Sequence, residues 1–193
     1  MKRNRLTLGG LGIAATVLTS GALADTVSSS QAHVYVIVNS NVSVGILDAN
    51  KQLSPVQIGT TTADVGFSVE ANQQTLTLGV AATDLYKGGD PTNTDVTPLK
   101  VDESLGATIS PTNANPTDGA SNVAQFVSDI TVNGMHGRRT NNIPFESSQN
   151  GRFGQDVHVH LGWRQTDPVQ PLGKYSGYVL LYTALLGKNG GTQ

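Results

Sequence analysis

Two histidines on one predicted strand have the spacing that best fits metal chemistry. His158 and His160 lie two residues apart in the alternating segment 156–165. Residues at that spacing share one face of a strand, where two imidazoles can bind zinc. His33 and His136 complete no ligand set by their position in the sequence, and no carboxylate lies at a matching spacing. We therefore expect an exposed strand face and no metal site.

Three aspartates surround a loop that could collect oxygen ligands for calcium. Asp84, Asp90 and Asp95 flank or lie in the loop 87–95, which also contains glycine, proline and asparagine. Their spacing fits no calcium-loop pattern, so a solvated turn is expected. The chain has no cysteine, which excludes thiol catalysis and zinc-thiolate sites. No cofactor is predicted.

A hydrolase would need a nucleophile, a base and an orienting group. Ser147 and Ser148 follow Glu146, but no partner is close in sequence and no G-x-S-x-G motif occurs. Paired carboxylates for glycoside cleavage stay open, because spatial pairing cannot be read from a sequence. With only three glutamates in the chain, we expect a protein that is not an enzyme.

Two further features have both a structural and a functional interpretation. Trp163, the only tryptophan, shares the parity of the apolar residues in 156–165, which predicts a core position; a sugar-stacking platform is the alternative. Arg138 and Arg139 follow Gly-Met-His-Gly and are expected at a loop tip, either solvated or touching a receptor. The role of the segment Phe145–Asp156 stays open.

The elements that must position these residues are predicted to be strands. Charged residues make up 13 % of the chain, and no window keeps an apolar period of 3.6 residues. This pattern predicts an all-β, immunoglobulin-like β-sandwich of one domain. We expect 65–71 and 75–83 to form a hairpin around 72–74, and 173–187 to be a strand buried on both faces. The other expected strands are 42–53 with a turn at 48–51, 98–101, 106–110 and 156–165, with loops at 87–95 and 111–122. The segment 124–134 is expected to form one strand or two short pieces.

Residues 1–24 read as a secretory signal peptide. Basic residues come first, an apolar stretch follows, and Ala22-Leu23-Ala24 ends the segment. The apolar stretch is too short for a membrane span. Removing this leader takes away three basic residues and changes the formal net charge from −2 to −5. That acidity argues against nucleic acid as a partner, so we expect an exported protein without a membrane span after cleavage.

The segment HVYVIVNS (33–40) is β-prone and apolar, and it lies near the predicted mature N-terminus. Val34, Val36 and Val38 would project from one face of a strand. A long apolar strand of this kind is an aggregation hazard unless it is paired. It either pairs inside its own sheet, as the first strand of a complete monomer, or inserts into a neighbouring subunit.

This order of features resembles the pilus subunits of the chaperone–usher route, in particular the cysteine-free alpha-class, colonisation-factor type. HVYVIVNS (33–40) followed by VSVGILDANKQLSP (42–55) is similar to their donor segment and first strand, and GKYSGYVLLYTAL (173–185) is similar to their closing strand. The segment 145–156 has no counterpart. The outline covers the whole mature chain, and the specific match lies at its two ends.

The resemblance implies a division into a signal peptide (1–24), an N-terminal donor strand (25–40) and an incomplete immunoglobulin-like pilin domain (41–193). Val34, Val36 and Val38 would be donated to a neighbour, and an acceptor groove would include Tyr175, Gly177, Val179, Leu181 and Leu185. The implied partners are other copies in a homopolymer, a periplasmic chaperone and an outer-membrane usher, and the implied location is a cell-surface fimbrium. The alternative is a monomeric secreted binding module for a carbohydrate or a protein.

Overall fold

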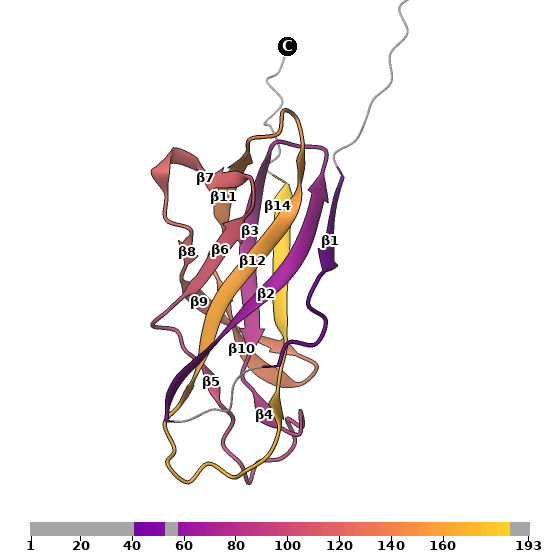
Figure 1. Ribbon diagram of the computed structural model, residues 1–193. Helices are drawn as coiled ribbons and strands as arrows, with labels where there is room; N and C mark the ends of the chain where they lie inside the picture. Colours follow the sequence, from indigo (N-terminus) through magenta and orange to yellow (C-terminus); the bar gives the residue numbers. More distant parts are fainter. Residues whose placement is uncertain (1–40, 53–57, 186–193) are drawn as a thin grey trace, which may run out of the picture. The chain divides into compact units, whose positions relative to one another are not determined.

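The computed structural model describes residues 41–52 and 58–185, which belong to one compact unit, and these residues are predominantly strands in antiparallel sheets (Figure 1). The all-β prediction is confirmed. The first sheet has six strands in the order β1-β2-β12-β6-β8, with β5 paired to β12. Their bounds are β1 Val42–Ile46, β2 Gly59–Ala71, β5 Lys100–Val101, β6 Ala107–Pro111, β8 Val123–Ala124 and β12 Phe153–Gln165.

The second sheet also has six strands, in the order β7-β11-β3-β10-β9, with β14 on the other side of β3. They are β3 Thr75–Thr83, β7 Ala114–Pro116, β9 Phe126–Val132, β10 Met135–Thr140, β11 Ile143–Ser147 and β14 Val179–Leu185. A short ladder joins β4 (Tyr86–Lys87) to β13 (Tyr175–Ser176), and one 3-10 turn, η1, covers Thr117–Gly119. No helix among the described residues is long and apolar enough to cross a membrane.

A hydrophobic cluster of buried residues lies between the two sheets. It takes alternate residues from β2 and β12 on one side and from β3 and β11 on the other, because side chains alternate across a strand. Phe145 and Phe153 are fully buried, and Trp163 is 3 % exposed. The Trp163 indole donates a hydrogen bond of 2.8 Å to the Thr83 carbonyl, which ties β12 of one sheet to β3 of the other. The core position predicted for Trp163 is confirmed.

The predicted hairpin of 65–71 and 75–83 is wrong, although both segments are strands. β2 belongs to the first sheet and β3 to the second, so the turn 72–74 carries the chain from one sheet to the other. The reason is that each strand already has partner strands on both of its sides, β1 and β12 for β2, and β14 against β10 and β11 for β3. The apolar rows of the two strands meet across the core. An alternating pattern fixes which face is apolar but does not say which strand lies beside it.

The loop tip predicted for Arg138 and Arg139 is also wrong. Both residues lie in β10, which pairs with β9 through a hairpin whose turn is Asn133-Gly134. These two turn residues have φ of 50° and 80°, the left-handed region that Asn-Gly hairpin turns require. The Asn-Gly dipeptide was the sequence signal for this hairpin. Of the two alternatives expected for 124–134, the structure has two pieces, β8 and β9, and these belong to different sheets.

The last strand differs from the prediction of burial on both faces. In β14, Leu181 is 8 % exposed and faces the core, whereas Leu180 on the opposite face is 37 % exposed. β14 pairs with β3 alone among the described strands. It is therefore an edge strand of that part of the chain, with one face in the core and one at the surface.

Candidate functional site

The predicted groove residues occupy two places in the structure. Val179, Leu181 and Leu185 lie on β14, opposite Ala82, Val80 and Leu76 of β3. Tyr175 is in β13, where its hydroxyl donates to the Pro171 carbonyl at 2.8 Å. Gly177 lies so close to Thr83 and Asp84 that a Cβ would overlap them. The predicted donor residues Val34, Val36 and Val38 lie outside the described residues.

The backbone of β14 has an edge that no described strand occupies. Thr83 N donates to Tyr178 O at 2.9 Å, which marks these opposite residues as a hydrogen-bonded pair. Such pairs alternate along an antiparallel ladder. Val179, Leu181 and Thr183 therefore direct their N–H and C=O groups away from β3, toward the unoccupied edge.

β1 has the same arrangement in the first sheet. Leu47 N donates to Gly66 O at 3.0 Å, so the alternation along the β1–β2 ladder can be counted from this pair. Val42, Val44 and Ile46 then direct their backbone groups away from β2. Within residues 41–52 and 58–185, no strand pairs with that edge.

The core-facing side chains of β1 are partly uncovered. Val44 is opposite Val69 and Ile46 is opposite Phe67, and opposite residues of a ladder share a face. Val69 and Phe67 are buried at 0 % and 3 % exposure, whereas Val44 is 38 % and Ile46 65 % exposed. The inner row of β1 therefore begins in the core and emerges at the surface along the strand.

The two unoccupied edges lie on the same side of the molecule, because β1 and β14 approach each other. Figure 1 shows β1 beside β2, with β14 in the other sheet. The residues 42–46 and 179–185 contain no charged residue and no proline, and both ladders run without a register shift. The Thr183 hydroxyl of the inner row is buried and has no hydrogen-bond partner among the described residues. This site, named here the open side, can accept main-chain bonds and apolar side chains from an added strand.

The outer edge of the second sheet at β9 differs from the open side. The ladder between β9 and β10 shifts register so that Val127 is an extra, bulged residue, 60 % exposed. Asp129 lies in the middle of the strand and accepts a hydrogen bond from Arg138. Bulges and charges are the devices that keep edge strands from pairing with other chains. The described part of the chain thus protects β9 and leaves the open side without such protection.

Arg138 of β10 and its partners form a charged cluster. The hydrogen bond from Arg138 lowers the pKa of the Asp129 carboxyl and raises the pKa of the Arg138 guanidinium. Arg138 also pairs with Glu103 at 2.9 Å. Arg139, its neighbour, stacks over the Tyr182 ring at 4.3 Å. Both arginines therefore have partners within the chain.

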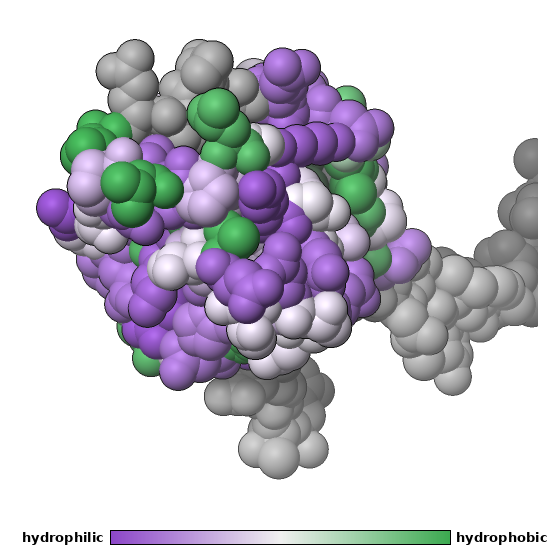
Figure 2. Space-filling model, turned by 90° about the horizontal axis from the view of Figure 1, so that it is seen from below, coloured by the Kyte–Doolittle hydropathy of each residue, from purple (hydrophilic) through white to green (hydrophobic). Residues whose placement is uncertain are grey.

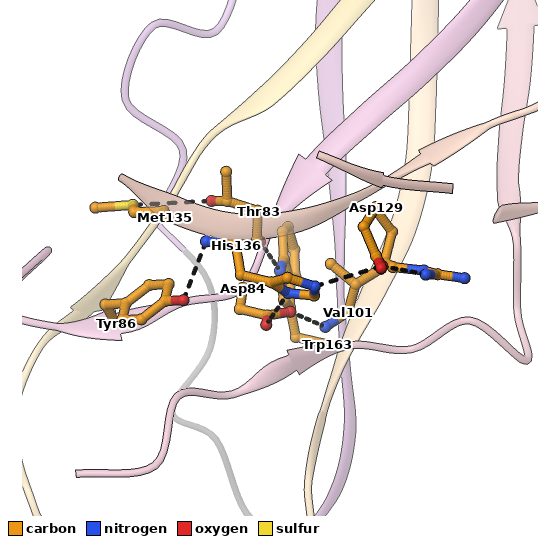
Figure 3. Close-up of polar contacts among 9 residues, drawn as sticks. Thr83, Asp84, Tyr86, Val101, Asp129, Met135, His136 and Trp163 are labelled. Atoms are coloured by element: carbon orange, nitrogen blue, oxygen red, sulfur yellow. Dashed lines mark hydrogen bonds and ion pairs between the residues drawn. The ribbon is translucent and has the colours of Figure 1, made fainter. Parts of the chain in front are cut away.

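An Asp–His pair beside this cluster has part of the geometry of a catalytic triad (Figure 3). The Asp84 carboxylate is buried; it accepts from Val101 N at 2.9 Å and lies 2.9 Å from His136 Nδ1. The other ring nitrogen of His136 lies 3.4 Å from the Asp129 carboxylate. A triad has a hydroxyl or thiol at that place. This cluster instead links β10 to the end of β3 and to β9.

The residues considered above as possible metal ligands do not converge. His158 and His160 are both exposed on β12, and His160 lies 3.4 Å from Asp64 of β2. Among Asp84, Asp90 and Asp95, the first is buried, and Asp90 accepts bonds from Thr92 that lower its carboxyl pKa. In the described part of the chain, no group of three or more histidine, aspartate or glutamate side chains could hold a metal ion.

The serines near Glu146 serve a crossover between the sheets. Ser147 is 1 % exposed, and its hydroxyl accepts from Gln149 N, while Ser148 donates to Asn113 O. The segment 148–152 connects β11 of the second sheet to β12 of the first. Gln149 holds this connection through two bonds of 2.9 Å with the Gly154 backbone. The segment Phe145–Asp156 thus has a structural role that the sequence alone did not indicate.

No protein-family model, curated protein or solved structure matches this chain.

Proposed function

We propose that this chain is an exported structural subunit of a cell-surface pilus, built as an incomplete immunoglobulin-like β-sandwich. The observation that carries the proposal is the open side. There, residues of β1 and β14 direct backbone groups to unoccupied edges and apolar side chains toward the core. A neighbouring subunit supplies the missing strand from its segment 33–40.

The energetics support an added strand at this side. The outward groups of Val179, Leu181 and Thr183 offer up to six hydrogen bonds, each contributing about 0.5–1.5 kcal/mol. Three buried valines from the donor add roughly 1.5 kcal/mol each or more. The hydrogen bonds and the valine burial together exceed the free-energy cost of association, about 4–15 kcal/mol, only when the added strand makes both kinds of contact along its whole length. A segment with alternating valines over 34–38 meets that condition.

The contrast between the edges supports the same function. The protected β9 edge prevents side-by-side pairing, so added strands are directed to the open side. Donation from one copy to the next is a head-to-tail contact that does not close, and such contacts generate filaments. In this proposal a periplasmic chaperone covers the open side before assembly, and an outer-membrane usher exchanges it for the next subunit.

The test is Val36→Asp in the full chain, with Ile37→Asp as the matched control at opposite parity. Donation predicts that Val36→Asp secretes as a folded monomer and forms no filaments by electron microscopy, because its carboxylate would be buried without a partner in the next subunit. Ile37→Asp should assemble. If Val36→Asp unfolds the monomer, the strand completes its own sheet and the proposal fails.

A second arm uses that monomer as the acceptor. The Val36→Asp chain keeps its own open side, so a synthetic HVYVIVNS peptide should bind it and raise its free energy of unfolding. At a peptide concentration of 100 times Kd, the gain is about 2.7 kcal/mol. A scrambled peptide of the same composition is the control. If both peptides stabilise the chain equally, or if neither peptide stabilises it, the assignment of the open side is contradicted.

A further inference from the structure

A surface cleft lies at the end of the molecule opposite to the sheet-to-sheet turns at 72–74 and 148–152. It has a volume of about 330 Å³ and is lined by Thr97–Ser104, which includes β5, and by Arg164 and three residues of the connection after β12. Figure 2 views the molecule from this end, where hydrophobic side chains occur in small groups among hydrophilic ones. The cleft uses none of the open-side residues.

Two cations stand directly opposite each other in this cleft. Lys100 of β5 is the register partner of Arg164 of β12, and both side chains are exposed on the outer face. Like charges directly opposite on paired strands are destabilising. Neither cation forms an ion pair within 4.0 Å with any described residue. Arg164 attracts the Asp102 carboxylate and helps to lower its pKa, but among the described residues no carboxylate is in direct contact with either cation.

The acidic residues around the cleft already have other partners. Asp102 accepts from Thr60 Oγ1 at 2.5 Å and from Ser104 Oγ at 2.6 Å. Asp167 accepts from Val169 N at 2.9 Å. Glu103 pairs with Arg138, as described above. These carboxylates hold the loops that form the walls and make no direct ion pair with Lys100 or Arg164, so both cations can contact a ligand.

We propose that this cleft binds a singly charged acidic sugar of the uronic acid class. The carboxylate would lie between Lys100 and Arg164, where charge-assisted hydrogen bonds are strongest. The hydroxyls would bond to the polar groups of the walls, which include Thr97, Ser104 and Thr166. The volume is at the lower end of small-molecule sites, about 300–1,000 Å³, and fits a single sugar ring. A doubly charged phosphate is disfavoured because three carboxylates line the same cleft.

The experiment is a titration of the full exported chain with D-glucuronate, followed by amide NMR shifts or calorimetry. Glucose supplies the same ring without the carboxylate, and inorganic phosphate supplies an anion without the ring. We expect a Kd in the range of about 1 mM for glucuronate, and binding at least about tenfold weaker for glucose and for phosphate. Binding of glucuronate should weaken as salt is raised.

Arg164→Gln and Lys100→Gln test the cations, and Lys174→Gln is the matched control. Lys174 is an exposed cation outside the cleft lining, so its loss changes the net charge equally. We expect each cleft variant to weaken glucuronate binding about tenfold or more, because a charged hydrogen bond is lost, and Lys174→Gln to leave it unchanged. Circular dichroism should show all three folded, since these side chains are exposed.

Three results would overturn the proposal: glucose binding as tightly as glucuronate, phosphate binding as tightly with the same loss in Arg164→Gln, or equal weakening by Lys174→Gln. Absence of glucuronate binding at about 20 mM, some twenty times the expected Kd, overturns it as well. The outcome is independent of filament assembly, because the cleft and the open side share no residue.

Discussion

Replacing Val44 with aspartate distinguishes two hypotheses: the open side is filled by a neighbouring subunit, or it is filled by a strand of the same chain. Val44 faces the core side of β1 but is 38 % exposed. Full burial of a valine contributes about 1.5 kcal/mol, so the part lost here is about 1 kcal/mol. The lower strand propensity of aspartate adds at most about 1 kcal/mol. The monomer should therefore lose about 1–2 kcal/mol and stay folded, since domains have about 5–15 kcal/mol.

Assembly should respond far more strongly to the same change. An added strand would cover Val44, and a carboxylate buried there without a partner costs roughly 3 kcal/mol or more. That free energy corresponds to a loss of about a hundredfold or more in subunit affinity. The assays are urea unfolding of the purified monomer and the yield of filaments from cells. Val44→Asp should be folded and unassembled.

Val69→Asp is the matched control, because Val69 is the cross-strand neighbour of Val44 and is fully buried. It should unfold the monomer by burying a charge in the core. If Val44→Asp unfolds the monomer to the same degree, the open side is already occupied by the chain's own residues. If Val44→Asp assembles normally, the added strand does not cover β1. Either result refutes the reasoning.

Three further predictions concern the rest of the molecule. Trp163→Phe removes the bond to the buried Thr83 carbonyl and should lower the free energy of unfolding by about 1–3 kcal/mol, seen as a lower urea midpoint with an unchanged m-value. Burial opposes ionisation of Asp102, but hydrogen bonds from Ser104 and Thr60 outweigh it and lower its pKa. Because the folded pKa is below the unfolded value of about 3.9, this contribution is present above about pH 4 and is lost as pH falls through the folded pKa; Asp102→Asn should flatten the acid limb of stability against pH. A chelator should leave the melting temperature unchanged, and a fall of several degrees would indicate metal at His158 and His160.

Individual strands were predictable from the sequence wherever alternation was regular. The segments 75–83 and 106–110 differ from β3 and β6 by one residue at most, and Trp163 was placed in the core by parity alone. A period of two depends only on neighbouring residues, so a sequence carries it directly. Part of the open side could also be predicted from the sequence, because residues 179–185 are uncharged and mostly apolar.

Lateral pairing was not predictable in the same way. β2 and β3 are adjacent in sequence and alternate in phase, yet they lie in opposite sheets. Their three-residue turn is compatible with a hairpin and with a crossing between layers, and only the packing of the other strands distinguishes the two. The loop-tip prediction for Arg138 was wrong for a different reason. The Asn133-Gly134 dipeptide places the turn four residues earlier in the chain and leaves Arg138 on the returning strand.

The edge strands of the second sheet, β9 and β14, differ in a way that bears on function. Both β9 and β14 end a six-stranded sheet within the described residues, but only β9 carries a bulge and an ion-paired aspartate. An edge with seven uncharged residues and no bulge is an aggregation hazard for a monomer that leaves it uncovered. Its presence beside the equally unprotected β1 is consistent with a chain whose fold is completed by one more strand. Whether that strand comes from the same copy or the next is the question that Val36→Asp and Val44→Asp answer.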